Sequence, residues 1–350
     1  MKYLILLIAC FQCYSAEILF YLQDAGETNA LLPVAEKLIE EGIDVEILLG
    51  GLAQSIVKDK GTPISAFGIP VEPNWTRTDH LPEEVIQTIA IHYRPKVFIS
   101  GVAFAVEGQL YDAFNSRGVN TIAFWDNFSA QGEDLYFSVA RQVQEKAKAL
   151  WVPTAQVAAA MAARSSVTVV GHPSLQKWAR EANRVDKQAI RDRLDLSSDE
   201  RVAVFVGGYG PLYEAAFKLF LDFASQVDDL TIFIQPHPKF GGTFELAKLS
   251  NNEKRPIRVL KNEVSTIEAV AMADFVFCHQ STVGFQAQFI GKPVTYFIPY
   301  EQQAPSFALN RVASSHDFNQ ALENKKGQTD FSLPLNSDSL CVKLLNKYRE

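Results

Sequence analysis

The chain has 350 residues, of which 47% are hydrophobic and 21% are charged, a composition typical of a globular protein with room for two α/β domains. Its formal net charge of -7 argues against a broad nucleic-acid surface, because such surfaces need clustered Lys and Arg. Nucleic acid is therefore not an expected partner, and the acidity indicates a solvated surface.

Residues 1–16 are typical of a secretory signal peptide. A basic second residue precedes a short apolar run, Tyr3–Phe11, and small residues surround Ser15 and Ala16. We expect cleavage near these two residues and an exported protein: periplasmic, secreted or in the lumen of the secretory pathway. Two alternatives stay open. Tyr3–Ala9 can be a buried first strand, and Leu7–Cys10 is similar to a lipoprotein cleavage box.

From Glu17 onwards, apolar strand-like runs alternate with helical ones. The chain first predicts a strand at Glu17–Leu22, a polar turn over Asp24–Asn29, and a helix over Ala30–Glu41 with apolar residues at helical spacing. The later strands of this half fit Asp44–Leu49, Lys96–Ser100, Thr121–Phe124, Ala149–Val152 and Val167–Val170, with helices such as Glu83–Tyr93 and Gly108–Ser116 between them. Such alternation implies parallel βαβ units in a doubly wound sheet.

A second alternating set begins at Val202, after a Gly-His-Pro-Ser turn at 171–174 and a polar, charged stretch over Lys177–Arg201. Its expected strands and helices are Val202–Val206, Leu212–Gln226 (helix), Leu230–Gln235, Ile257–Leu260, Phe275–Cys278, Val283–Ile290 (helix) and Val294–Ile298. We therefore predict two Rossmann-like domains, 17–171 and 172–330, and a tail, 331–350, whose helix near Ser337–Tyr348 can pack back on the first domain. The alternative is one large sheet.

Two polar turns of the second half are predicted to bind phosphate. Gly207, Gly208 and Gly210 follow a strand and open a helix, where glycines let the backbone approach a diphosphate closely. Ser281 and Thr282 lie at a predicted helix N-terminus, where unpaired N–H groups and the helix dipole favour an anion. For the glycines, a tight turn without a ligand is an equal alternative.

His237 lies between two prolines that hold its backbone rigidly at a strand end, with Lys239 beyond it. Its imidazole can donate a hydrogen bond to a phosphate. Because it shares a sheet with the glycine turn and the Ser281 helix start, we expect all three to meet at one edge. Glu268, in the helix before Ala273-Asp274, can reach a ribose or sugar hydroxyl or can be a solvated helix residue.

Carboxylates in the first half are candidate catalytic bases. Asp24 and Glu27 lie in the first strand–helix turn, and Asp126 lies in an aromatic segment after a later strand. All three are expected at carboxyl ends of strands facing an interdomain cleft, where a carboxylate can deprotonate an acceptor hydroxyl. Partial burial among aromatic rings would raise the pKa of Asp126 toward that of a useful base. His172 and His279 are expected to line the same cleft.

Removal of the leader would leave two cysteines, Cys278 and Cys341, which leave room for one disulfide. The Cys and His spacings do not resemble a zinc site, so no metal is expected. The sequons at Asn74 and Asn127 carry meaning only in a eukaryotic secretory pathway.

Three segments resemble motifs of the GT-B glycosyltransferase superfamily, which includes lipid-A-disaccharide synthase and the nucleotide-sugar 2-epimerases. Val170–Leu175 resembles the Gly-Asn-Pro segment at the domain junction, with His172 where Asn is usual. Pro236-His237-Pro238 followed by Ser281-Thr282 resembles the HP and Ser/Thr motifs of bacterial sialyl- and Kdo-transferases. The paired acidic-acidic-Gly motif is replaced by Asp24-Ala-Gly26 and Asp126-Asn127.

The resemblance implies the GT-B fold: two Rossmann-like domains facing each other across a cleft, the first for the acceptor and the second for the nucleotide-sugar donor. It implies a metal-independent glycosyltransferase that uses the nucleotide-sugar as co-substrate, needs no cofactor, acts on a glycan or lipid-glycan acceptor and has peripheral membrane contact. The alternatives are an exported GT-B-like protein that binds a glycan or nucleotide without catalysis, and a nucleotide-sugar epimerase.

Overall fold

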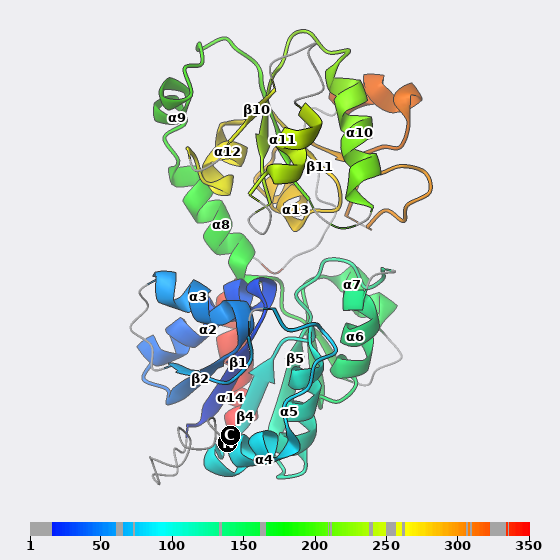
Figure 1. Ribbon diagram of the computed structural model, residues 1–350. Helices are drawn as coiled ribbons and strands as arrows, with labels where there is room; N and C mark the ends of the chain where they lie inside the picture. The colour runs from blue at the N-terminus through cyan, green and yellow to red at the C-terminus, as the bar shows by residue number, and fades with distance from the viewer. Residues whose placement is uncertain are drawn as a thin grey trace. The chain divides into compact units, whose positions relative to one another are not determined.

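The chain forms two compact units (Figure 1). The computed structural model describes residues 16–60, 66–72, 74–132, 135–161, 166–208, 210, 212–237, 241–249, 257–260, 263–305, 307–308, 310–322, 334 and 336–350. One unit comprises Met1–Gln176 and Phe331–Glu350, and the other comprises Lys177–Asp330. Residues 1–15 of the predicted leader and Lys239 lie outside the described residues.

The first unit is built on a parallel sheet with the strand order β3-β2-β1-β4-β5-β6-β7 in its described part. The strands are β1 (Ile18–Leu22), β2 (Val45–Leu49), β3 (Ala66–Gly68), β4 (Val97–Ser100), β5 (Asn120–Phe124), β6 (Ala149–Val152) and β7 (Val167–Val169). In the register, Phe20 of β1 lies opposite Ile47 and Ile99. The predicted doubly wound sheet is confirmed. The short edge strand β3 escapes prediction because its residues are partly or fully exposed and lack an apolar run.

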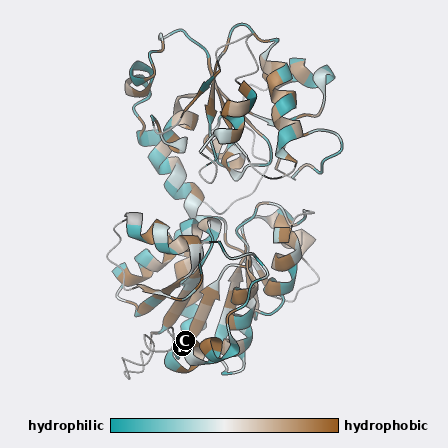
Figure 2. Cartoon of the chain, in the orientation of Figure 1, coloured by the Kyte–Doolittle hydropathy of each residue, from teal (hydrophilic) through white to brown (hydrophobic). Residues whose placement is uncertain are grey.

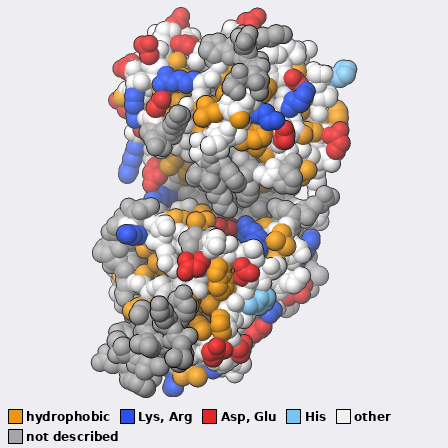
Figure 3. Space-filling view, viewed as in Figure 1, with side chains coloured by type: hydrophobic (Ala, Val, Ile, Leu, Met, Phe, Trp, Pro, Cys, Tyr) orange, Lys and Arg blue, Asp and Glu red, His pale blue; other side chains and the backbone are white. Residues whose placement is uncertain are grey.

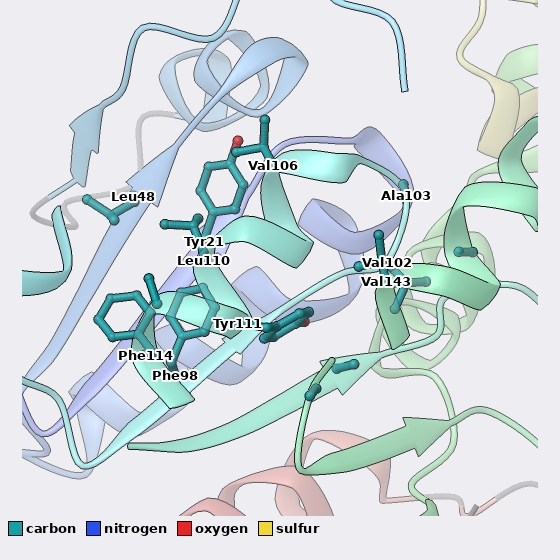
Figure 4. Close-up of a cluster of buried hydrophobic side chains, with 14 of the residues drawn as sticks. Tyr21, Leu48, Phe98, Val102, Ala103, Val106, Leu110, Tyr111, Phe114 and Val143 are labelled. Carbon is teal, nitrogen blue, oxygen red and sulfur yellow. The ribbon is translucent and has the colours of Figure 1, made fainter. Parts of the chain in front are cut away.

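Helices cover both faces of this sheet and bury its apolar strands, which are brown in Figure 2. They are α2 (Ala25–Glu40), α3 (Gly51–Lys60), α4 (Glu83–His92), α5 (Ala105–Asn115), α6 (Leu135–Gln144), α7 (Ala155–Ala160) and α14 (Ser337–Arg349). On one face, Phe98 of β4 stacks on Phe114 of α5 with ring centroids 4.5 Å apart (Figure 4). Burial of one such side chain stabilises the fold by about 1.5–3 kcal/mol.

The C-terminal helix α14 is a structural part of the first unit. It buries Cys341, Val342 and Leu345 in the core on the α2 side of the sheet. Asn120 of β5 donates a 2.9 Å hydrogen bond to the Tyr348 carbonyl, and Arg349 pairs with Glu17. The helix expected near the end of the 331–350 tail therefore packs on the first unit.

The boundary between the units also differs from the predicted one at 171/172, because the first unit extends to Gln176. His172 is buried, and its ring packs 5.0 Å from that of Phe128 and 5.7 Å from that of Phe124. The Gly-His-Pro segment therefore belongs to the first unit, and the boundary falls inside helix α8 (Pro173–Arg184).

The second unit repeats the plan with a parallel sheet in the order β10-β9-β8-β11-β12-β13 over its described residues. The elements are α9 (Lys187–Arg193), β8 (Val202–Val206), α10 (Tyr213–Ala224), β9 (Thr231–Gln235), α11 (Thr243–Leu249), β10 (Arg258–Val259), α12 (Thr266–Met272), β11 (Phe275–Cys278), α13 (Thr282–Phe289), β12 (Val294–Phe297), β13 (Arg311–Val312) and a 3-10 helix, Ser315–Leu322. Its core is aromatic: Phe205 stacks on Phe220 at 4.1 Å. The polar, charged stretch Lys177–Arg201, for which no element was predicted, contains most of α8 and all of α9.

Acidic and basic side chains are interspersed on the face shown in Figure 3. Within the described ranges, no helix is both long and apolar enough to cross a membrane. Cys278 and Cys341 are both buried free thiols, which corrects the disulfide considered for them.

Candidate functional site

Three neighbouring strands of the first unit, β1, β4 and β5, end at one edge of the sheet, and a polar segment follows each of them. Asp24 follows β1, Gly101 follows β4 and Asp126 follows β5. In doubly wound sheets, ligands bind outside the carboxyl ends of the strands. We call Asp24, Glu27, Glu107 and Asp126, which lie at or just beyond this edge, the carboxylate cluster.

The sequence predicts a polar turn at Asp24–Asn29, but in the structure Asp24 is the N-cap of helix α2. Its side chain accepts a hydrogen bond from Ala25 N at 2.9 Å, and Glu27 completes a capping box by bonding back to Asp24 N at 2.9 Å. The Asp-x-x-Glu pattern is the sequence signature of such a box. Residues 25–29 are therefore the first turns of the helix, which aims its positive N-terminal end at the edge.

Arg77 is the basic partner of Asp24, with Nη2 3.4 Å from Oδ2, and the two side chains are 22% and 21% exposed. Its Nη1 also donates to the Ala103 carbonyl at 3.1 Å. The guanidinium carbon lies 5.2 Å from the ring centre of Phe104 and 5.0 Å from that of Tyr136. Arg77 is therefore held by four groups at the rim of the cluster.

Asp126 is half-buried, and Tyr136 donates a 2.7 Å hydrogen bond to its Oδ1. Its Oδ2 lies so close to the first turn of α2 that a Cβ on Gly26 would overlap it. Burial raises the pKa of Asp126 to about 6, against the opposing effect of the Tyr136 hydrogen bond. A carboxylate of this pKa is ionised at neutral pH and is a stronger base than an ordinary aspartate.

His172 lies beside Asp126 and is bonded to its backbone, while its Nδ1 lies 2.7 Å from Ser174 Oγ. Burial lowers the pKa of His172 to about 4. The imidazole is therefore neutral at pH 7. Its two hydrogen-bond partners and its aromatic neighbours make it a support for the Asp126 segment.

Glu27 and Glu107 are the fully buried members of the carboxylate cluster and lie within hydrogen-bonding reach of each other. Burial raises the pKa of both carboxyl groups, and the nearby Glu27 carboxylate raises that of Glu107 further. Sequence reasoning singled out Glu27 but missed Glu107, Arg77 and Tyr136. The available signal for Glu107 was its place at the third position of a helix that follows a strand.

In the second unit, β9, β8 and β11 are neighbours, so the predicted phosphate-binding segments do come to one edge of the sheet. Gly207 follows β8, and its backbone N–H donates to the Gln235 carbonyl at 2.8 Å. A Cβ on Gly207 would lie 3.0 Å from His237 N, which places His237 beside the glycine turn. His237 is half-buried and interacts with at least one other group of the protein.

The glycines of this turn have a packing reason as well as the predicted ligand-binding one. A Cβ on Gly207 would lie 2.8 Å from Glu245 Oε1, and one on Gly208 would lie 2.8 Å from the Tyr213 ring. Tyr213 donates a buried 2.7 Å hydrogen bond to that same Glu245 oxygen. Gly210 has φ +92°, a conformation that favours glycine. The turn is thus shaped by the side chains beneath it.

Ser281 is the N-cap of α13, where its side chain accepts a 3.2 Å hydrogen bond from Val283 N, and Thr282 is the first helical residue. The predicted helix start is confirmed. His279, expected to line a cleft, is instead buried with Nε2 2.5 Å from Gln302 Oε1. Burial lowers its pKa, so it is neutral at pH 7.

Glu268 lies at the start of α12. Its Oε1 pairs with Arg193 at 3.0 Å and its Oε2 accepts from Ser265 N at 2.7 Å. The Ser265 backbone and Arg193 hold the pKa of Glu268 below its usual range. Both oxygens have protein partners, and its predicted contact with a sugar stays a prediction. Over the described parts of the chain, no group of three or more His, Cys, Asp or Glu side chains could hold a metal ion.

The chain contains two doubly wound parallel sheets, each with polar residues at the carboxyl ends of its central strands, as the GT-B fold does. The chain matches no protein-family model and no curated protein. It does match solved structures. UDP-GlcNAc 2-epimerase from Methanocaldococcus jannaschii aligns with a TM-score of 0.70 and 12% identity, over 94% of this chain and 99% of its own.

UDP-GlcNAc 2-epimerase from Neisseria meningitidis, solved with UDP-GlcNAc bound, aligns with a TM-score of 0.70 and 11% identity over 94% of this chain and 99% of its own. MurG from Acinetobacter baumannii aligns with a TM-score of 0.57 and 13% identity over 95% and 99%. The chain therefore has the GT-B fold that the sequence motifs predict.

Proposed function

We propose that this chain is an enzyme that acts on a nucleotide-sugar, and that epimerisation of a UDP-N-acetylhexosamine is the reaction it supports best. The observation that carries the proposal is Asp126: a half-buried carboxylate with a pKa raised to about 6, oriented by Tyr136 at the carboxyl edge of the first sheet. Such a group can take and return a proton near neutral pH.

The second unit supplies the expected nucleotide contacts. The glycine turn, His237 and the N-terminus of α13 lie at the ends of adjacent strands. Backbone N–H groups, a helix N-terminus and an imidazole donor together suit the two phosphates of a nucleoside diphosphate. The preference for UDP rests on the solved structures with this fold, of which several are UDP-GlcNAc 2-epimerases.

Epimerisation is preferred to glycosyl transfer because of the number of acid/base groups. To invert a carbon, a proton must leave one face of the sugar and a proton must be added to the other face. Asp24 and Asp126 both lie at the edge of the first sheet, and Arg77 and Tyr136 link them. Glycosyl transfer is the second candidate, because it needs only one base to deprotonate an acceptor hydroxyl. Asp126, a partly exposed carboxylate of raised pKa at this edge, could be that base.

Proton NMR of UDP-GlcNAc with the protein tests the proposal. Conversion to the 2-epimer without an added acceptor, and its loss in D126N, is the expected result. Loss of UDP-GlcNAc only after addition of a glycan acceptor would favour transfer. Calorimetric binding of UDP without turnover in either arm would identify a catalytically silent binding protein. If UDP and UDP-GlcNAc both fail to bind at millimolar concentration, the proposal is wrong. Export through the predicted leader stays a separate proposal, tested by mass spectrometry of the mature N-terminus.

A further inference from the structure

The pair Glu27–Glu107 joins the starts of two helices. Glu27 Oε1 accepts hydrogen bonds from Gln23 N and Asp24 N at the start of α2. Glu107 Oε2 accepts one from Phe104 N at 2.9 Å at the start of α5. The strands before these helices, β1 and β4, are neighbours in the sheet. Each glutamate therefore uses one oxygen to accept backbone hydrogen bonds at the N-terminus of its own helix.

The other two oxygens, Glu27 Oε2 and Glu107 Oε1, meet over Gly101. A Cβ on Gly101 would overlap Glu27 Oε2 and would lie 3.0 Å from Glu107 Oε1. Both oxygens are buried, and among the described residues no donor faces either of them. The two side chains are 1% and 0% exposed. Two carboxylate oxygens can bond to each other only if a proton lies between them.

Among the described neighbours, none supplies a cation or a hydrogen-bond donor to the two free oxygens of the pair. Tyr21 donates its proton to Gln23 Oε1 at 2.6 Å, and the Tyr111 hydroxyl is 2.8 Å from the Ser100 and Gly101 carbonyls. Both tyrosines line the core shown in Figure 4. Asp24 adds a further negative charge, and Arg77 is paired with Asp24. Two buried like charges without a cation cannot both persist.

We propose that Glu107 holds a proton at neutral pH and donates it to Glu27, so that one carboxyl–carboxylate hydrogen bond ties the starts of α2 and α5 together and positions Asp24. Glu27 is the acceptor because two backbone N–H groups already stabilise its anion, whereas Glu107 has one. Short O–H···O⁻ bonds of this kind are among the stronger hydrogen bonds in proteins. The role of Asp24 rests on the proposed function; the shared proton does not.

Proton linkage of unfolding tests the shared proton without any ligand. Above about pH 5 an unfolded glutamate has lost its proton, whereas folded Glu107 keeps it, so the native state binds one more proton. Between pH 5.5 and 7, the ratio of the wild-type unfolding constant to that of E107Q should therefore rise about tenfold for each pH unit. In E107Q, the amide N–H replaces the proton as donor. E84Q, the same change at an exposed helix start, should keep the wild-type slope.

Parallel pH dependences of the wild type and E107Q would overturn the proposal. If E107Q does not fold, infrared spectroscopy of the wild type at pH 8 tests the shared proton instead. Asp126 is ionised at that pH and contributes no carboxylic-acid band. A carboxylic-acid band is expected, and it should persist in E46Q, because Glu46 is another buried glutamate whose pKa is raised by burial. Absence of the band would refute the shared proton. For positioning, E107A should lose turnover while E107Q retains it. A protein that turns over no nucleotide-sugar but shows the linkage would refute the proposed function alone.

Discussion

Replacement of Asp126 by Asn should make the first unit more stable at neutral pH while abolishing turnover. Burial raises the pKa of Asp126 from 3.8 to about 6. Because the folded pKa lies above the unfolded one, the native state binds more protons in this window. The contribution of Asp126 to the free energy of unfolding is then greatest below about pH 4, falls as the pH rises through about 6, and is constant above that pH. The full penalty is about 3 kcal/mol, at 1.36 kcal/mol per pKa unit.

About half of that penalty, roughly 1.5 kcal/mol, should appear between pH 5 and pH 7.5. Asn keeps an acceptor for Tyr136 but carries no charge, so D126N should lack this part of the pH dependence. Urea unfolding followed by tryptophan fluorescence reports mainly on the first unit, which holds Trp75, Trp125 and Trp151. D112N is the control, because Asp112 is 58% exposed. If the wild type and D126N lose stability equally between the two pH values, the assignment of a raised pKa to Asp126 is wrong.

Three further changes have distinct expected outcomes. His237→Ala should weaken UDP binding by about 1.5–3 kcal/mol in calorimetry with little change in stability, since it removes one hydrogen bond to a charged group; unchanged affinity would exclude His237 from the phosphate site. Gly101→Ala should destabilise the first unit by about 2–3 kcal/mol in urea unfolding, because its Cβ would overlap Glu27; a neutral effect would contradict that packing. Leu345→Ala should cost about 2–5 kcal/mol through a cavity under α14, and a wild-type midpoint would show that this helix is dispensable.

The sheets were predictable because buried parallel strands are short continuous apolar runs, such as β1 and β8. The amphipathic helix α8 was not, because charged and polar residues together outnumber apolar ones along it and hide its periodicity. The two-residue strand β13 is too short to show any pattern. The start of α2 at Ala25 was marked by a capping-box pattern, which a reading for polar turns passed over.

The candidate site was predictable only in part. Asp24 and Asp126 follow strands directly, so the topology alone brings them to one edge. Arg77 comes from a loop 53 residues from Asp24, and a single sequence contains no signal for that contact. In the sequence, Glu107 looks like an ordinary helix residue, because its burial depends on the tertiary structure. The glycine turn was found, but its fit against Glu245 depends on a helix that follows later in the chain.

Deuterium incorporation tests the central claim most directly. UDP-GlcNAc incubated with the protein in heavy water should gain deuterium at C2 as a protein-bound acid/base group removes and returns the proton, and D126N should not catalyse the exchange while still binding UDP. Full retention of the C2 proton by a wild-type protein that binds UDP-GlcNAc would contradict the assignment of Asp126 as the base of an epimerase.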